Sequence, residues 1–342
     1  MNILLTGSDG YIGSVASQVL MKAGFEVTGL DTGFYRRGWF YNGIEKFPTV
    51  LTKDTRDVTV EDLQGFDAIV HMADLSNDPL GETNPELTQE INHLATVQLA
   101  KKAKQAGVKR FVHMSSCSVY GVATEDVVSE KSEINPQTEY ARCKALVERD
   151  VTKLGDDNFS PTFMRNSTVY GASPRIRFDL VVNNLAGLAF TTNTIAMTSD
   201  GSPWRPLVHV LDLSKAIVCI LKAPQEKIHN QIFNVGNNDG NYRVKEVAEI
   251  IGQIFTGSKV TFGNSDGDTR SYRVNFDKIH STLPDFRCDY DVKKGAEQLK
   301  KIFEQVAMNS ELFAFEPFTR IKELKRLMET NQIDEKYYWR ST

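Results

Sequence analysis

The N-terminus joins a short apolar run, Ile3-Leu4-Leu5, to a segment in which Gly7, Gly10 and Gly13 recur at every third position. Glycine permits tight turns and the close approach of a backbone to a ligand. A strand that turns into a helix in this way directs the free N–H groups of the helix N-terminus at a bound anion. The segment therefore predicts a strand–turn–helix unit that holds a pyrophosphate group.

Strand and helix patterns then alternate along the chain. Apolar strands are expected at 2–6, 27–31, 67–73, 110–115 and 161–165, and helices at 11–24, 84–106, 138–154 and 243–256. Such alternation indicates right-handed βαβ units and a parallel sheet. We expect an α/β fold, a Rossmann-type doubly wound parallel sheet with a smaller, mostly C-terminal substrate-binding lobe.

The 342 residues are enough for two lobes and an appendage. Residues 173–207 are rich in Asn, Thr, Pro and Gly and predict loops of the substrate lobe. The expected Rossmann domain comprises 1–172 with 208–235, the substrate-binding lobe comprises 173–207 with 236–304, and a helical C-terminal tail comprises 305–342. The tail ends in the aromatic run 337–339, and we expect it to dock on the body or on a second subunit without a catalytic role.

Composition argues against several classes of partner. The net charge is −4 without a long basic run, which disfavours nucleic acid. No apolar stretch approaches the roughly 20 residues of a membrane span, and residues 1–3 lead into a strand without a signal-peptide pattern. The scattered cysteines lack metal-ligand spacing and predict reduced thiols in a cytoplasmic protein that needs no metal. They are Cys117, Cys143, Cys219 and Cys288.

Tyr140 and Lys144 stand four residues apart in the expected helix 138–154, and Ser116 precedes them. Residues at this spacing share one face of a helix. The Lys144 ammonium would favour the phenolate of Tyr140, which at an ordinary pKa of about 10 is a poor base at neutral pH. The trio predicts a general base, Tyr140, that takes a hydroxyl proton while NAD accepts hydride, with Ser116 orienting the same oxygen.

Asp31 ends the second expected strand, where a carboxylate binds the adenosine ribose hydroxyls and repels a 2′-phosphate. This favours NAD over NADP, whereas Arg36 and Arg37 just beyond it are the features that would favour NADP. Asp54 follows the third strand; it either reaches the adenine amine or is a solvated loop carboxylate.

Several motifs, in order, resemble those of the extended short-chain dehydrogenase/reductase family, specifically its nucleotide-sugar epimerases and dehydratases. The resemblance covers about residues 1–300. It rests on Thr6-Gly7 to Gly13 (TGxxGxxG), His71-Met72-Ala73 (HxAA, with Asp74 in place of the second alanine), Asn92, Ser115 to Gly121 (SSxxVYG), Tyr140 and Lys144 (YxxxK), Arg165 to Gly171 (RxxNVYG, with Thr168 where asparagine is usual), Asn183-Asn184-Leu185 (NNL) and Gly201 to Asp212 (GxxxRxxVHVxD).

This resemblance implies functional residues. The implied catalytic residues are Ser116, Tyr140 and Lys144. The implied cofactor contacts are Gly7, Asp9, Gly10, Tyr11, Ile12, Gly13, Asp31, Asp54, Thr55, Met72, Ala73, Asn92, Tyr140 and Lys144. The implied substrate contacts are Ser116, Cys117, Thr168, Asn184, Arg205 and Arg270. The family's RxGD motif lies near 265–268, but its arginine is missing, and we expect Arg270 to bind the diphosphate from a shifted position.

Three reactions are compatible with these motifs. The 4,6-dehydratases of the family resemble one another in an acidic pair after the catalytic Ser/Thr, where this chain has Cys117 and Ser118, which disfavours dehydration. We expect a UDP-hexose-like 4-epimerase that acts through a transient 4-keto sugar. Cys117 also resembles the cysteine of family members that epimerise C3 and C5, or is a small buried hydrophobe.

The stretch 173–180 and the long tail are similar to a branch associated with modified surface sugars, so a one-way 4-dehydrogenase or 4-ketoreductase is the alternative. A non-catalytic NAD-binding regulator is disfavoured because Tyr140 and Lys144 are both intact. Family members resemble homodimers built on a four-helix interface, which would use the helices near 90–106 and 138–154.

Overall fold

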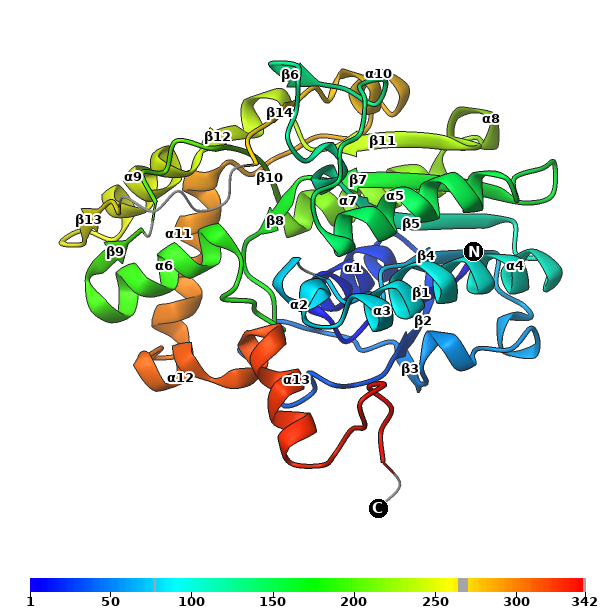
Figure 1. Ribbon diagram of the computed structural model, residues 1–342, viewed down its shortest axis with the longest axis horizontal. Coiled ribbons are helices and arrows are strands. Elements are labelled where there is room, and N and C mark those ends of the chain that lie inside the picture. The colour runs from blue at the N-terminus through cyan, green and yellow to red at the C-terminus, as the bar shows by residue number, and fades with distance from the viewer. Residues whose placement is uncertain (77, 198, 264–269, 341–342) are drawn as a thin grey trace.

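The computed structural model describes residues 1–76, 78–197, 199–263 and 270–340. Its centre is a seven-stranded sheet in the order β11-β7-β5-β4-β1-β2-β3, and all its strand pairs are parallel (Figure 1). The strands are β1 Asn2–Thr6, β2 Glu26–Asp31, β3 Thr49–Thr52, β4 Ala68–His71, β5 Arg110–Ser116, β7 Ser160–Asn166 and β11 Gln231–Val235. The strand order reverses between β1 and β4, and a ligand crevice forms at such a switch point.

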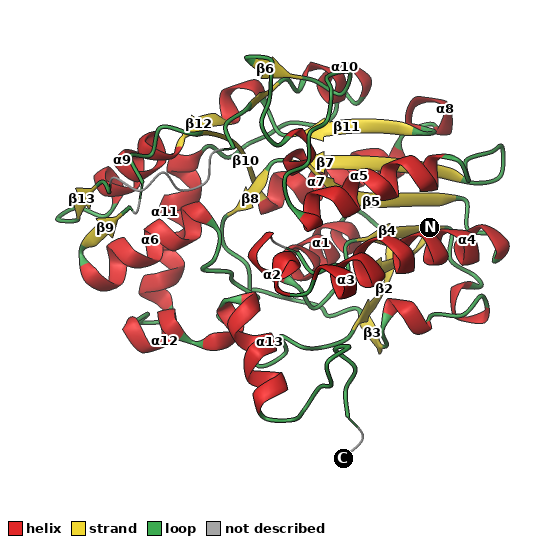
Figure 2. Ribbon diagram, viewed as in Figure 1, coloured by secondary structure: helices red, strands yellow, loops and turns green. Residues whose placement is uncertain are grey.

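Helices cover both faces of this sheet (Figure 2). Ile3 and Leu5 belong to the hydrophobic cluster that contains α1 Tyr11–Lys22 and α7 Val210–Lys222. Leu4 belongs to the cluster on the other face, with α4 Thr96–Gln105 and α5 Glu139–Thr152. Successive strand residues point to opposite faces, so a continuous apolar run such as residues 3–5 is typical of a strand covered on both sides. The predicted Rossmann-type α/β fold is confirmed.

The helix expected at 84–106 is interrupted. It consists of α3 Pro85–Thr88, a π-helical segment Gln89–Ala95 and α4. Within the π-helical segment, Asn92 is fully buried; its Nδ2 donates to the Leu75 carbonyl at 3.0 Å and its Oδ1 accepts from the Leu75 N–H at 2.8 Å. The side chain thereby fixes the loop that follows β4.

Smaller elements flank the main sheet. Strands β8 Thr168–Tyr170, β10 Trp204–His209 and β12 Asn241–Arg243 form one sheet, β9 Thr194–Ala196 pairs with β13 Lys259–Thr261, and β6 Val127–Val128 pairs with β14 Arg273–Val274. Helices α6 Val181–Thr192, α9 Val244–Ile254 and α11 Val292–Gln305 pack together beside them. The short helices are α2 Asp78–Thr83, α8 Gln225–Ile228, α10 Asp277–Thr282 and α12 Ser310–Ala314.

The prediction that 173–207 forms loops is wrong for α6. This helix buries Val182, Leu185, Ala186 and Ala189, four small or branched apolar residues on one face. Composition alone did not indicate this apolar face, because polar residues lie between its members. The neighbouring helices supply the apolar surface on which this segment packs as a helix.

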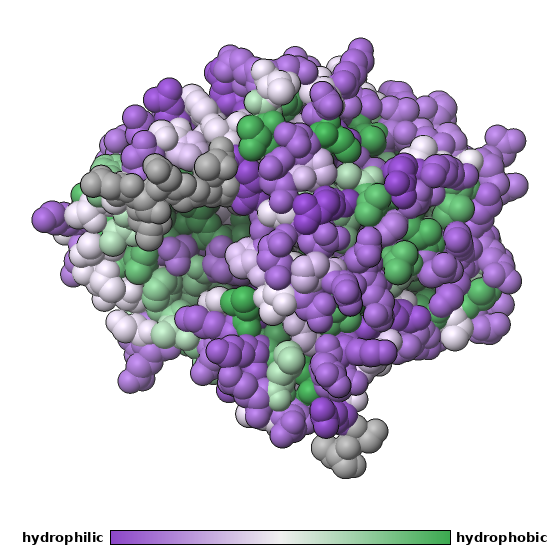
Figure 3. All heavy atoms as spheres, viewed as in Figure 1, coloured by the Kyte–Doolittle hydropathy of each residue, from purple (hydrophilic) through white to green (hydrophobic). Residues whose placement is uncertain are grey.

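The C-terminal segment packs on the body through α13 Arg320–Glu329, beside α2 (Figure 1). Its Leu324 and Leu327 join Leu75 and Leu87 in a separate buried cluster. The tail therefore packs on the body, which is one of the two placements that the sequence left open. The face in Figure 3 is mainly hydrophilic with small hydrophobic patches, and in the described part of the chain no helix is both long and apolar enough to cross a bilayer.

An aromatic cluster of Phe40, Phe178, Phe303 and Phe318 joins the tail to the body, with ring centroids 5.3–5.9 Å from Phe40. Phe303 is fully buried, so Phe303→Ala should lower the free energy of unfolding by about 3–5 kcal/mol in urea denaturation. The matched variant Phe47→Ala, at a ring 61% exposed, should change it by less than about 0.5 kcal/mol. Equal effects of the two variants would contradict this packing.

Candidate active site

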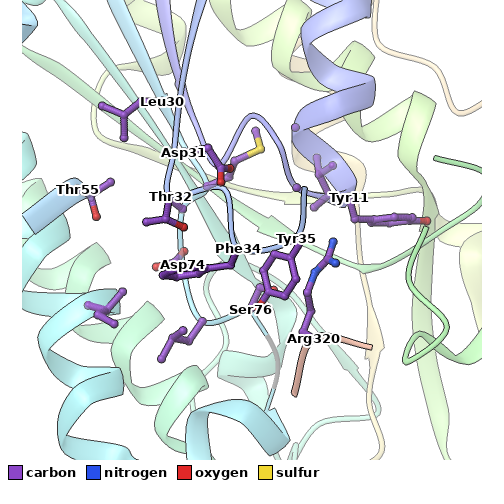
Figure 4. A pocket seen from close by; sticks show the side chains of 18 of the residues that line it. Tyr11, Leu30, Asp31, Thr32, Phe34, Tyr35, Thr55, Asp74, Ser76 and Arg320 are labelled. Atoms are coloured by element: carbon purple, nitrogen blue, oxygen red, sulfur yellow. The ribbon is translucent and has the colours of Figure 1, made fainter. Parts of the chain in front are cut away.

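A cavity opens at the carboxyl ends of β1, β2, β3 and β4, and we name it the glycine-loop cavity (Figure 4). It brings together most residues that the sequence associated with a dinucleotide. Those lining it are Gly7, Gly10, Tyr11, Ile12, Gly13, Asp31, Asp54, Thr55, Met72 and Ala73. They come from four different strand ends, as a parallel sheet with this strand order requires.

The glycine loop has the geometry that an anion requires. Gly7 has a φ of +72°, a conformation that glycine adopts without strain. A Cβ atom on Gly13 would lie 2.1 Å from the carbonyl oxygen of Gly7, so only glycine allows the first turn of α1 to pack this closely on the loop. The N-terminus of α1 thereby faces the cavity, and this arrangement fits a dinucleotide diphosphate.

The Asp31 carboxylate is held by its backbone neighbours. Its Oδ1 accepts from the Gly33 N–H at 2.7 Å and its Oδ2 from the Asp9 N–H at 3.0 Å. Burial, and secondly the nearby Asp9 carboxylate, raise the pKa of Asp31 to about 6. A buried carboxylate at this position suits the hydroxyls of a ribose and disfavours a phosphate.

Four of the predicted cofactor contacts do not line this cavity: Tyr140 and Lys144 line the neighbouring cavity described below, and Asp9 and Asn92 line neither. The Asp9 carboxylate turns away and forms an ion pair with Arg36, whose Nε lies 2.7 Å from Asp9 Oδ2. Arg36 is therefore engaged by a carboxylate of the protein, which removes the main reason to expect NADP. Asn92 is occupied by the backbone of Leu75, as described above, and supports the cavity wall from behind.

Asp54 lines the cavity but is not a simple solvated carboxylate. It caps a short 3₁₀ turn by accepting from the Arg56 N–H at 2.8 Å, and it forms an ion pair with the Arg56 guanidinium at 2.9 Å. The guanidinium in turn stacks on Tyr338, 3.9 Å from the ring centroid. The C-terminal tail therefore contacts the Asp54–Arg56 ion pair at the wall of the cavity.

A second cavity, the tyrosine cavity, adjoins the first. Both are lined by Tyr11, Ile12, Met72, Asp74, Ser76 and Arg177, so they form one continuous site. The predicted residues that line the tyrosine cavity are Ser116, Tyr140, Lys144, Thr168, Arg205 and Arg270. The structure thus gathers the predicted catalytic residues beside the predicted cofactor residues.

Tyr140 and Lys144 lie on the first turns of α5, which Thr138 caps by accepting from the Ala141 N–H at 3.2 Å. The Lys144 Nζ is 5.5 Å from the Tyr140 ring centroid. Burial raises the pKa of Tyr140; the Lys144 ammonium and a hydrogen bond with Ser116 oppose this effect, while nearby carboxylates reinforce it. In the protein without ligands the net shift is upward, so Tyr140 is a phenol rather than a phenolate.

Burial is the main cause of this upward shift in the pKa of Tyr140, and Asp74, which stood out in the sequence only as a departure from the HxAA motif, reinforces it. Its Oδ2 lies 2.5 Å from Lys144 Nζ, and both side chains are almost fully buried. Lys144 also donates to the Met114 carbonyl at 2.5 Å. Burial acts to lower the pKa of Lys144, but Asp74 and Tyr140 outweigh it and raise that pKa. Asp74 Oδ1 has no hydrogen-bond partner in the part of the chain that the structure describes, and Asp74 lines both cavities.

Two predicted substrate contacts lie outside the tyrosine cavity. The Cys117 thiol is buried and donates to the Arg165 carbonyl at 3.1 Å, and burial raises its pKa far above the ordinary value. Cys117 is therefore placed as a buried hydrophobe rather than as an acid or base. The Asn184 side chain donates to the Phe178 carbonyl at 2.8 Å and orders the entry to α6.

Both arginines predicted to bind a diphosphate already have partners. Arg270 Nη1 lies 2.7 Å from Asp78 Oδ2, and Arg205 donates to the carbonyls of Trp204 and Arg270. Residues 265–268, which carry the altered RxGD motif, lie outside the described residues. The sequence did not predict many of the other residues in these walls, among them Phe34, Tyr35, Asp78, Tyr272 and Arg320.

The sequence matches the NAD dependent epimerase/dehydratase family over residues 3–236. It is 29% identical to the UDP-glucose 4-epimerase of Corynebacterium glutamicum over 74% of this chain and 80% of the relative. It is 25% identical to the UDP-glucose 4-epimerase of Bacillus subtilis over 87% of this chain and 94% of the relative.

Solved structures agree with this relationship. MoeE5 in complex with UDP-glucuronic acid and NAD superposes with a TM-score of 0.77 at 25% identity, over 89% of this chain and 99% of that chain. DesIV, a dTDP-glucose 4,6-dehydratase from Streptomyces venezuelae with NAD bound, gives a TM-score of 0.79 over 93% of this chain and 100% of that chain; at 24% identity it shows the fold alone.

The chain belongs to the NAD-dependent epimerase/dehydratase family. It is an NAD-dependent enzyme of the nucleotide-sugar epimerase/dehydratase type. The predicted cofactor and the family resemblance are thereby confirmed, whereas the roles assigned to single residues stay predictions.

The raised pKa of Asp31 should make NAD binding depend on pH. Since its pKa is about 6, the carboxylate gains a proton as the pH falls through that value and loses acceptor capacity. NAD affinity, measured by calorimetry between pH 5 and 8, should therefore weaken below about pH 6. Asp31→Asn should bind NAD weakly at every pH, whereas Asp285→Asn, at an exposed position, should follow the wild type. An unchanged pH profile in Asp31→Asn would contradict this role.

The second prediction concerns Asp74. Its carboxylate raises the pKa of Tyr140, so Asp74→Asn should lower that pKa and extend activity toward acid. The acid limb of kcat/KM against pH should move down by about 1 pH unit. Thermal unfolding and NAD titration of the variant control for damage to the buried pair. A limb that stays in place in a folded, NAD-loaded variant would show that Asp74 acts only structurally.

Proposed function

We propose that this protein is an NAD-dependent nucleotide-sugar 4-epimerase that acts on a UDP-hexose through a transient 4-keto sugar. The observation that carries the proposal is the placement of Tyr140, Ser116 and Lys144 in a cavity continuous with the glycine-loop cavity. Its curated relatives include UDP-glucose 4-epimerases from several organisms, which supports a reaction at C4 of a UDP-sugar.

In this proposal Tyr140 is the acid and base of both half-reactions. The Lys144 ammonium, which already lowers the pKa of Tyr140, stabilises the phenolate that takes the proton of the 4-hydroxyl. Ser116 donates to the same substrate oxygen and holds it near Tyr140. A bound NAD would supply the hydride-transfer chemistry at C4. After the keto sugar has turned in the cavity, Tyr140 returns the proton to the 4-oxygen. Because hydride then reaches the other face of C4, the configuration at C4 is inverted.

The environment of Ser116 disfavours dehydration. The residue after it, Cys117, is buried away from the cavity, and the next, Ser118, has no acidic group. Two described carboxylates line the tyrosine cavity, Asp74 and Asp78, and each already forms an ion pair with a cation. Neither is placed as a free acid for a leaving hydroxyl.

Arg270 and Arg205 are the proposed ligands of the sugar diphosphate, because a guanidinium offers a planar fork of donors to phosphate oxygens. Arg270 would exchange the Asp78 carboxylate for a phosphate oxygen, which makes substrate binding release one ion pair. A homodimer and a cytoplasmic location stay predictions.

The proposal is tested with purified protein and UDP-glucose or UDP-galactose singly, with products followed by NMR and absorbance at 340 nm. We expect interconversion of the 4-epimers without accumulation of NADH. Tyr140→Phe should reduce the rate by about 10²–10⁴-fold while NAD binding persists. Tyr337→Phe, at a buried tyrosine of the C-terminal cluster, is the matched control and should retain the rate.

Two outcomes would contradict the proposal. Accumulating NADH with a keto-sugar product would identify a one-way 4-dehydrogenase. Loss of water from the sugar, detected as a mass decrease of the product, would identify a dehydratase. Activity with a dTDP- or GDP-sugar but not with a UDP-sugar would be consistent with the 4-epimerase reaction. It would overturn the proposal that the nucleotide of the substrate is UDP.

A further inference from the structure

The C-terminal tail closes one side of the glycine-loop cavity. Trp339 Nε1 donates to the Thr32 carbonyl, next to Asp31, at 2.7 Å, and its ring lies 5.5 Å from Phe34. Arg56 Nη2 donates to the Lys336 carbonyl at 2.9 Å. These contacts lie far beyond residue 236, where the family match ends. The tail therefore reaches the glycine-loop cavity from outside the range that the family model matches.

Arg320, the first residue of α13, lines that cavity. Its side chain lies beside the Tyr35 ring (Figure 4), and the Arg320 Cζ is 4.0 Å from the ring centroid. The residue is 3% exposed, its Nη1 donates to the Pro317 carbonyl at 3.0 Å, and its Nη2 has no hydrogen-bond partner among the described residues. The guanidinium is thus held in place through Nη1, whereas Nη2 is buried without an acceptor among the described residues.

Arg320 forms no ion pair within the described part of the chain, although the carboxylates of Asp179 and Asp31 lie near enough to oppose part of the effect of burial. The nearby carboxylate of Asp179 takes two hydrogen bonds from Arg177, and the Asp31 carboxylate takes two from the backbone. Burial, with Arg177 as a second cause, lowers the pKa of Arg320 to about 10. A buried cation without a partner is costly, and a buried N–H without an acceptor adds to that cost. The position is therefore prepared for an anion.

The ligand of this cavity contains one suitable anion. NAD has neutral riboses and adenine and a cationic nicotinamide, so its diphosphate is the part that a guanidinium attracts. The diphosphate belongs at the N-terminus of α1, where Gly10, Tyr11, Ile12 and Gly13 line the same cavity as Arg320. We propose that Arg320 of the C-terminal tail binds the diphosphate of NAD from the side opposite the glycine loop.

This inference rests on the NAD site and not on the sugar or on the direction of the reaction. It gives the tail a binding function: NAD bridges the glycine loop and α13, and cofactor binding should order both together. In this proposal Arg320 of α13 is part of the NAD site.

The test uses the full-length protein stripped of NAD, with NAD and ADP titrated by calorimetry and adenosine by competition with NAD. Arg320→Gln should weaken NAD and ADP at least tenfold, because a charge-assisted hydrogen bond is lost, and should leave adenosine within twofold. Arg320→Lys should recover part of the loss. Arg326→Gln, on the same helix but paired with Glu323, should stay within twofold of the wild type.

Two results would overturn the inference: an NAD affinity of Arg320→Gln within twofold of wild type, or an equal loss for adenosine, which would mean that Arg320 only packs on Tyr35. Hydrogen–deuterium exchange of the wild type decides the matter if Arg320→Gln does not fold. NAD should then protect the amides of α13, and the absence of protection would reject the proposal. Since these readouts need no sugar, failure here is distinct from failure of the epimerase assay.

Discussion

The buried ammonium of Lys144 is the interaction on which the site depends. Removing a charge from water is costly unless strong partners replace the water, and here the Met114 carbonyl and the Asp74 carboxylate do so. Met114 belongs to β5, Asp74 follows β4, and Lys144 lies on α5. One cation therefore ties two strand ends to the helix that carries Tyr140, and it places the phenol at the junction of the two cavities.

Charge pairing separates the side chains of this site into two kinds. Lys144, Arg177 and Arg270 each have a carboxylate of the protein as partner. Arg320 forms no ion pair with a described residue, and within the same part of the chain its Nη2 has no acceptor. The paired cations hold the walls in shape before a ligand enters, and substrate binding must compete with their carboxylates. For Arg320, a bound anion would offset the cost of burying the guanidinium.

The tail changes the architecture of a common fold without changing its core. The sheet and its covering helices form the hydrophobic clusters on either side of β1, and the tail adds a third cluster around Leu75. Leu75 is also the residue whose backbone Asn92 holds. The loop after β4 is consequently fixed from the inside by Asn92 and from the outside by α13, so that Asp74, immediately before Leu75, has one defined position.

The sequence by itself determined the features that have a local cause. The glycine spacing specified the turn from β1 to α1, the apolar runs specified strands covered on both faces, and the four-residue spacing placed Tyr140 and Lys144 on one helix face. Only the tertiary structure decided that Asp9 turns to Arg36, that Asp74 meets Lys144, that α6 is a helix and that Arg320 enters the cofactor cavity. These outcomes depend on contacts between residues distant in the chain, and neither a single arginine nor a single aspartate has a periodic pattern that reveals its partner. Packing of α13 against Leu75 carries Arg320 to the cavity, and no local property of the sequence around residue 320 contains that information.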